Sequence, residues 1–279
     1  NDVGWLSINV PANDIATRGI MPKWFVLTLI LPLGFSDESL SRVMDQVWDA
    51  LSEIGGTLIG GHTEYSGEVH YPITSTTVMG VGDSYISTSG LRPGHLIVAT
   101  KFAAIEATAI AARDMQNELI QRGVSPTIIS RAAALIRKTS IVKEALIAAK
   151  YASSMHDPTE GGVIQGLIEM ASASNTCIDI ESDIPVLEET THVLGALGID
   201  AYRSLSSGML LIGAPPGSID SLINELIMTS IPAKLIGKAK ACDEPRVSMK
   251  GFSIRADSFV EDDLIRVMDK SKKLNYASS

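Results

Sequence analysis

Three short clusters of the chain combine carboxylates with amide, hydroxyl or glycine neighbours, and these residues could carry chemistry. They are Asn13–Asp14, the run Gly60–Gly61–His62–Thr63–Glu64, and the run His156–Asp157–Pro158–Thr159–Glu160–Gly161–Gly162. Carboxylate oxygens are the ligands that Mg²⁺ takes in proteins, and glycine backbones allow a close approach to phosphate oxygens. The residue types therefore indicate binding of a metal ion together with a phosphate group.

The first cluster is a polar pair inside a mostly apolar, helix-periodic segment. Burying a lone carboxylate is costly, so we expect Asp14 to face solvent, a partner or a ligand. The alternative is that Asn13 and Asp14 only cap a helix or form a surface turn.

The second cluster follows an expected strand, Thr57–Ile59, that we predict to stop at the glycine pair. A turn at Gly60–Gly61 would bring main-chain N–H groups close to an anion, with the side chains of His62, Thr63 and Glu64 beside it. The alternative is an ordinary glycine turn that carries exposed polar residues.

The third cluster precedes an expected helix over Gly161–Ser174, with Thr159 as its N-cap. The free N–H groups of a first helical turn make an anion site, here at Gly161 and Gly162. Asp157 and Glu160 would hold Mg²⁺ between themselves and a polyphosphate. Helix capping alone is the alternative, and it does not exclude a ligand.

Several other kinds of site are disfavoured by the sequence. The chain has no GxxxxGK[ST] loop, no GxGxxG followed by a helix, no GxSxG and no HExxH. Cys177 and Cys242 form neither a metal-binding spacing nor a disulfide framework, which indicates a reducing, cytoplasmic location.

Alternating strands and helices predict an α/β or α+β fold with helices on a sheet face. Ser36 is placed to cap a helix that Gly55–Gly56 ends, and Pro126 is placed at the first position of another helix.

A polar, turn-rich segment, Asp83–Gly94, indicates a boundary between two lobes. We expect lobes over residues 1–90 and 91–245, followed by a tail with one helix over 246–279. The expected strands are Trp24–Leu31, Thr57–Ile59, Ile73–Gly82, Leu96–Thr100, Cys177–Ile180, Met209–Gly213 and Ala233–Gly237.

Composition limits the class of protein further. The 279 residues are 45% hydrophobic and 5% aromatic, which argues against disorder. The net charge of −9, without any basic run, makes nucleic acid an unexpected partner. The most apolar run, Trp24–Phe35, is too short to span a bilayer, so no membrane partner is expected.

Taken in order, five segments resemble the aminoimidazole ribonucleotide synthetase superfamily. They are NDIATRGIMP, IGGHTE, LRPGHLIVAT, HDPTEGGV and SSGMLLIGAP, which lie within roughly residues 1–240. The GGHTE and DPTEGG sequences resemble most those of archaeal proteins related to the hydrogenase maturation factor that makes cyanide ligands. The resemblance implies a two-lobed enzyme that uses ATP and Mg²⁺ to activate an oxygen of a small-molecule substrate. It also implies a homodimer in which two N-terminal lobes share a β-barrel and the C-terminal lobe carries helices on a mixed sheet.

The resemblance assigns roles residue by residue. Asp14, Glu64 and Asp157 match metal-binding positions. His62 stands where relatives have Asp or Glu, and Glu160 replaces Arg or Asp. With Asp14, Glu64 and Asp157 they make up the catalytic set that the resemblance implies. The nucleotide-binding positions are matched by Asn13, Gly60, Gly61, Thr63, Thr159, Gly161 and Gly162.

Some features of the superfamily are not found in the chain. Because the chain begins at Asn1 and not at Met, we expect preceding sequence that carries the family's glycine-rich loop; a processed N-terminus is the alternative. The C-terminal cysteine of the cyanide-forming factor is replaced by Ala277–Ser278–Ser279, which disfavours that reaction. The rival to an ATP-dependent enzyme is a non-catalytic, nucleotide-binding dimeric module of the same fold.

Overall fold

The protein is described by a computed structural model that covers residues 2–269. The chain divides into two compact units, Asn1–Tyr85 and Ile86–Ser279. The division falls inside the turn-rich segment Asp83–Gly94. Each unit is described separately below.

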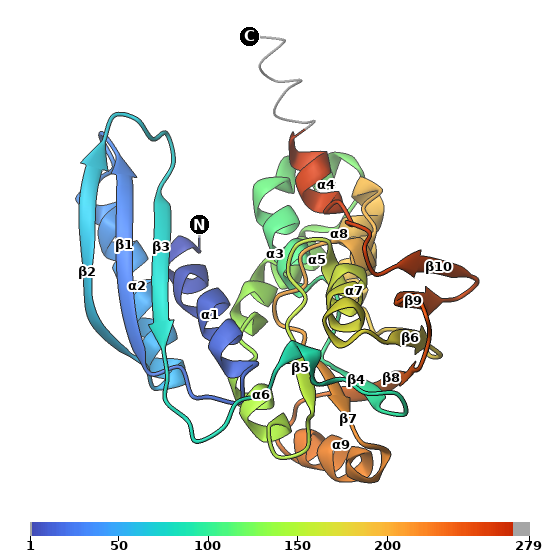
Figure 1. The fold of residues 1–279 in the computed structure, drawn as a ribbon. Helices are drawn as coiled ribbons and strands as arrows, with labels where there is room; N and C mark the ends of the chain where they lie inside the picture. The colour runs from blue at the N-terminus through green and yellow to red at the C-terminus, as the bar shows by residue number, and fades with distance from the viewer. Residues whose placement is uncertain (1, 270–279) are drawn as a thin grey trace. The chain divides into compact units, whose positions relative to one another are not determined.

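The N-terminal unit is a small sheet with helices on one face (Figure 1). Within the described residues its strands have the order β2-β1-β3, with β2 parallel and β3 antiparallel to β1. Every second residue of β1 is buried, and Thr76 Oγ1 of β3 donates a 2.6 Å hydrogen bond to the Ser7 carbonyl of α1. The elements are α1 (Val3–Ala16), β1 (Trp24–Pro32), α2 (Asp37–Ile54), β2 (Thr57–Ser66) and β3 (Ile73–Met79).

The opposite face of this sheet, called here the open face, carries apolar side chains. The alternate residues of β1 that point to it are only half-buried, and β3 adds Ile73, 50% exposed, and Met79, 40% exposed. Its apolar members are Trp24, Val26, Ile30, Ile73 and Met79.

Helix α2 begins and ends as the sequence predicts. The Ser36 side chain accepts a hydrogen bond from the Ser39 amide at 3.2 Å, and Asp37 and Glu38 occupy the first turn, where the helix dipole favours anions. Gly55 ends the helix with a φ of 70°.

Strand β2 does not stop at the glycine pair, so the predicted turn at Gly60–Gly61 is wrong. The strand continues to Ser66, and neither glycine has a positive φ. Gly61 is required for another reason, because a Cβ atom there would lie 2.0 Å from the Leu27 carbonyl oxygen of β1. Gly61 thus permits close strand packing beside a bulge at Phe25/Val26.

The C-terminal unit is built on a mixed sheet, which confirms the α/β character expected for it. Within residues 86–269 the strand order is β10-β9-β6-β8-β4-β7-β5. The strands are β4 (Leu96–Thr100), β5 (Ser154–His156), β6 (Cys177–Ile180), β7 (Leu211–Ala214), β8 (Ala233–Lys240), β9 (Arg246–Met249) and β10 (Phe252–Arg255).

Two apolar cores hold this unit together. In the first, helix α7 packs on the sheet, and the core includes Leu167 of α7 and Ile178 of β6. In the second, α3, α5 and α8 pack on one another around Leu119 and Leu194. No helix of the described residues is long and apolar enough to cross a membrane. The helices are α3 (Ile105–Asp114), α4 (Gln116–Gln121), α5 (Pro126–Ala134), α6 (Val142–Ala148), α7 (Gly162–Ser174), α8 (Glu188–Leu197) and α9 (Ile219–Met228).

The segment expected to be a tail with one helix contributes two strands to the sheet before that helix. Residues 246–255 form β9 and β10, and β9 pairs in parallel with β6. A helix follows over 263–269, and the remainder of the predicted tail, 270–279, lies outside the described residues.

The two cysteines are joined, which corrects the expectation from their spacing. Cys177 of β6 and Cys242, in the loop after β8, form a disulfide across a sequence separation of 65 residues. Spacing could not indicate this bond, because the sheet alone brings the two positions together.

Candidate functional site

One end of the C-terminal sheet collects the third cluster and two further segments. Strand β7 is antiparallel to both β4 and β5, with Leu211 opposite Ala99 and His156. The carboxyl ends of β4 and β5 therefore meet the start of β7. The segments at this end are the start of α3, the cluster after β5 and the loop 204–208 before β7, and loops at a sheet end are where α/β folds hold their ligands.

The two glycines of this cluster are required by close packing. Gly161 and Gly162 have φ values of 73° and 65°. A Cβ atom at Gly161 would lie 2.6 Å from the Val260 carbonyl oxygen, and one at Gly162 would lie 2.6 Å from the Ser204 amide nitrogen. The cluster is thereby fixed against the loop before β7 and against the segment after β10.

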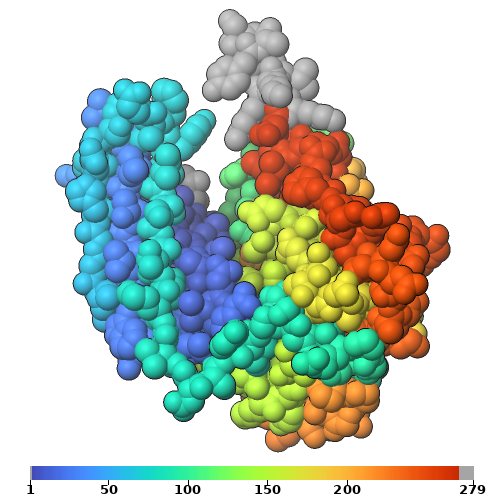
Figure 2. All heavy atoms as spheres, in the orientation of Figure 1, coloured from blue at the N-terminus to red at the C-terminus, as the bar shows by residue number. Residues whose placement is uncertain are grey.

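Helix α7 begins differently from the prediction. Its N-cap residue is Gly161, with no side-chain cap, so Thr159 does not cap the helix; the Thr159 carbonyl accepts a 3.0 Å hydrogen bond from the Gly162 amide. The Gly161 amide donates a 3.0 Å hydrogen bond to Asp262 Oδ2. A carboxylate of the chain itself therefore occupies the position where a phosphate oxygen was expected. In Figure 2 the red segment after β10 lies directly against the yellow surface of α7.

The acidic residues of the cluster lie in different surroundings. Asp157 is buried, whereas Glu160 is exposed. His156 Nε2 lies 2.5 Å from Glu169 Oε2 of α7, and this hydrogen bond holds the pKa of Glu169 below its ordinary value. The His156–Glu169 pair ties the start of the cluster to the helix that follows it.

Glu106, on the first turn of α3, also belongs to this end of the sheet and was missed at the level of sequence. It is 7% exposed. Burial raises the pKa of its carboxyl, the nearby charges of Glu160 and Asp262 raise it further, and interactions with Ser207 oppose the rise. The available signal was a lone carboxylate in an alanine- and isoleucine-rich helix start.

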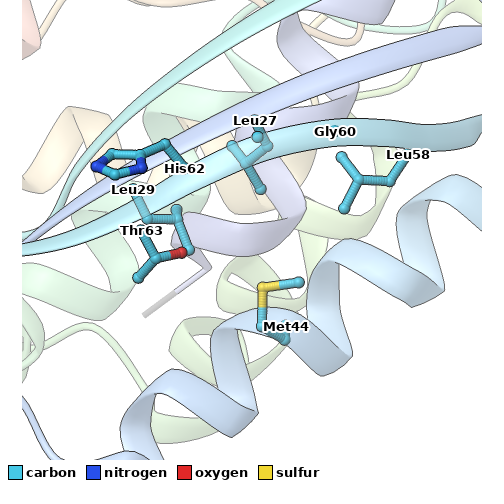
Figure 3. A pocket seen from close by; sticks show the side chains of 8 residues that line it. Leu27, Leu29, Met44, Leu58, Gly60, His62 and Thr63 are labelled. Carbon is cyan, nitrogen blue, oxygen red and sulfur yellow. The ribbon is translucent and has the colours of Figure 1, made fainter.

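The second cluster lies in the N-terminal unit, along β2, and one side of it lines a pocket of about 220 Å³ (Figure 3). Thr63 points toward Met44 of α2 on this side, and Leu27 and Leu29 of β1 add apolar walls. The His62 ring points away from Met44, and its Nε2 lies 3.6 Å from Glu64 Oε2.

The first cluster lies near the end of α1. Asn13 is fully buried, and Asp14 is exposed as predicted. The Asp14 carbonyl accepts a 2.7 Å hydrogen bond from Thr17 Oγ1, which holds the end of the helix.

The N-terminal unit does not bring Asp14 and Glu64 together. Helix α1 packs against β3 and α2, whereas β2 forms the other edge of the sheet (Figure 1). Glu64 is in register with Ile30 and so points to the open face. Among residues 2–269 no group of three or more His, Cys, Asp or Glu side chains is arranged to hold a metal ion. Joint use of Asp14 with Asp157, which belongs to the other unit, stays a prediction.

The sequence matches two family models in the order of the two units. The N-terminal domain of AIR synthase related protein matches residues 1–82, and the C-terminal domain matches residues 92–250. The chain belongs to the AIR synthase related family. The resemblance on which the sequence interpretation rests is thereby confirmed.

Curated relatives of this AIR synthase related protein include hydrogenase maturation proteins. A hydrogenase expression/formation protein of Methanocaldococcus jannaschii is 29% identical over 215 residues, which are 76% of this chain and 62% of the relative. Carbamoyl dehydratase HypE of Cupriavidus necator is 27% identical over 227 residues, 80% of this chain and 62% of the relative. The chain thus spans 62% of the length of these relatives.

Solved structures share the fold. HypE of Escherichia coli superposes with a TM-score of 0.78 at 22% identity, over 95% of this chain and 82% of that one. A HypE in complex with ATP gives 0.73 at 20% identity, over 95% and 81%. A ThiL complexed with AMPPCP and TMP gives 0.73 at 18% identity, over 91% and 80%.

Proposed function

We propose that this protein is an ATP- and Mg²⁺-dependent enzyme that transfers a phosphoryl group from ATP to an oxygen of a small metabolite and releases ADP. The observation that carries the proposal is the match to both domains of the family, combined with a fold shared with a HypE that binds ATP and a ThiL that binds AMPPCP. Phosphoryl transfer needs positioning and charge neutralisation more than covalent chemistry from the protein, which suits carboxylates on fixed backbone segments.

The chain's carboxylates fit Mg²⁺ that arrives with a nucleotide. Because the described residues contain no three-ligand group, the protein alone offers no complete cage. Mg²⁺ is often held by one or two carboxylates together with phosphate oxygens and water, and Asp14 and Asp157, each in its own unit, would each supply such a carboxylate. When bound, the ion would neutralise phosphate charge. Glu64 is left outside this set because it points to the open face.

A non-catalytic nucleotide-binding module is the second candidate, and one observation favours it. Asp262 already accepts the Gly161 N–H at the start of α7. If nucleotide phosphate does not displace this carboxylate, the helix start takes no part in holding phosphate, and the contribution of the C-terminal unit is reduced to Asp157 and Thr159.

Calorimetric titration with Mg-ATP tests binding. We expect Asp14→Asn and Asp157→Asn each to weaken binding at least about tenfold, a loss of roughly 1.4 kcal/mol. Asp114→Asn, at an exposed position that ends α3, is the matched control and should bind like the unaltered chain. Unchanged affinity in both site variants would refute the assignment of these carboxylates.

Measurement of ADP release over a panel of small metabolites separates the enzyme from the module. Turnover that one metabolite stimulates and that Asp157→Asn abolishes supports the enzyme. Tight Mg-ATP binding without stimulated turnover on any member of the panel favours the module.

A further inference from the structure

Glu106 is a buried acid whose side chain is not fully used by the fold. The residue is 7% exposed; Ser207 acts on its carboxyl by hydrogen bonding, but its Oε2 atom has no hydrogen-bond partner among the described residues. Leaving a buried carboxyl oxygen without a donor costs stability, on the order of 1–3 kcal/mol or more. A buried polar atom of this kind calls for an explanation, and service to a ligand is one of them.

The backbone around Glu106 holds this carboxyl in a fixed place. The Ala107 amide donates a 3.0 Å hydrogen bond to the Leu205 carbonyl, and the Ala104 amide donates a 2.9 Å hydrogen bond to Ser206 Oγ. The start of α3 is thus tied to the loop before β7, and Gly162 packs against Ser204 of the same loop. Glu106 therefore lies where the three segments of the candidate site meet.

The charges that act on Glu106 are negative. Glu160, which is exposed, and Asp262, which is buried, both raise the pKa of the Glu106 carboxyl, and no cation contributes to its shift. A positively charged group placed beside Glu106 would relieve this repulsion and would favour the ionised acid.

The geometry favours a nitrogen cation over a metal ion. Both oxygens of Asp262 are committed, Oδ2 to the Gly161 amide and Oδ1 to the Ile265 amide at 3.1 Å. A divalent metal held by the protein alone needs several oxygen ligands, and no suitable group of three acidic, His or Cys side chains exists in residues 2–269. An N–H donor needs only the one acceptor that Oε2 provides.

We propose that Glu106 binds a positively charged, N–H-donating group of the small-molecule substrate, such as an ammonium, amidinium or guanidinium group, with Glu160 adding attraction at the surface. This assignment rests on the proposed function, because it names a property of the substrate of that enzyme. It places the substrate at the same end of the C-terminal sheet as Asp157, which is assigned above to the Mg²⁺ of the nucleotide.

The test uses the full chain with ¹³C-labelled glutamate side chains and methylguanidinium as the probe, followed by NMR at constant ionic strength. Glu106→Gln identifies the Glu106 signal and keeps the shape of the side chain. We expect methylguanidinium to shift this signal saturably, and Glu106→Gln to weaken probe binding, followed on the remaining glutamate signals, at least about tenfold. Tetramethylammonium, a cation without N–H groups, should have no saturable effect.

Two further variants control the result. Glu106→Asp keeps the charge on a shorter side chain and should bind the probe with intermediate affinity. Glu118→Gln, which removes the half-buried partner of Arg122 on α4, should bind the probe normally. Equal probe affinity in Glu106→Gln and the unaltered chain, an equal response to tetramethylammonium, or no saturable response would overturn the proposal.

Mg-ATP calorimetry on the same variants separates this inference from the proposed function. Normal Mg-ATP affinity in a folded Glu106→Gln supports a substrate contact, whereas a tenfold loss would reassign Glu106 to the nucleotide and overturn the inference. Methylguanidinium binding without any Mg-ATP binding would contradict the proposed function while supporting the Glu106 site.

Discussion

Gly60 and Gly61 are neighbours in β2 but meet very different surroundings. A Cβ atom at Gly61 would lie 2.0 Å from the Leu27 carbonyl oxygen, whereas one at Gly60 would have nothing within 4 Å. We expect Gly61→Ala to lower the free energy of unfolding by about 1–3 kcal/mol, because β2 must move away from β1. Gly60→Ala, the matched control, should change it by less than about 0.5 kcal/mol. Urea unfolding measures both, and equal stabilities would contradict this account of the glycine pair.

Glu106 should make stability depend on pH. Its pKa is raised in the folded protein above the ordinary value of 4.5, so the folded state binds more protons than the unfolded state above that pH. The contribution of Glu106 to the free energy of unfolding therefore falls as pH rises from this value through the folded pKa, and is constant beyond it. Glu106→Gln lacks this loss, so its stability relative to the unaltered chain should increase with pH. Urea unfolding between about pH 4 and pH 8 tests this, and a constant difference would contradict the raised pKa.

At the scale of elements, local signals predicted helix ends well and long-range packing poorly. Ser36 and Gly55 mark the ends of α2, and Pro126 begins α5, because capping depends on residues within one turn. The local sequence of the glycine pair in β2 predicts a turn. Only the neighbouring strand β1 shows why a side chain is excluded at Gly61. The same limit applies to the site: its glycines and Asp157 were predicted from a loop pattern, whereas Asp262 and Glu106 join it through tertiary packing alone.

The disulfide links β6 to the loop between β8 and β9, and so closes a long segment of the C-terminal sheet. Cross-linking residues 65 apart restricts the unfolded chain, which typically stabilises a protein by about 2–4 kcal/mol. We expect Cys242→Ser to lower the free energy of unfolding by this amount. Reductant should lower the stability of the unaltered chain equally and leave the variant unchanged.

Thiol titration of the unfolded chain tests the same bond directly. The chain has two cysteines, so no reactive thiol is expected before reduction and two are expected after it. Two reactive thiols before reduction would show that the bond is absent.

At the scale of the whole molecule, the two units use their sheets differently. The sheet of the C-terminal unit carries α7 on an apolar core, and its end carries the acidic and glycine-rich segments. The sheet of the N-terminal unit has its described helices on one face and leaves Trp24, Val26, Ile30, Ile73 and Met79 on the other. Exposed apolar faces of this kind are typical of protein–protein contacts. We propose that the open face pairs with that of a second copy, as the shared barrel implied by the sequence would require.

Charge placed on the open face should separate the two copies. A stable dimer buries at least about 1,000 Å² in total, and a carboxylate inside such an interface would be desolvated without a partner. We expect Ile73→Glu to halve the mass measured by light scattering at micromolar concentration. Ile227→Glu, at a position of α9 with a similar exposure of 55%, should leave the mass unchanged. A monomeric unaltered chain, or a dimer that Ile73→Glu leaves intact, would show that the open face does not join two copies.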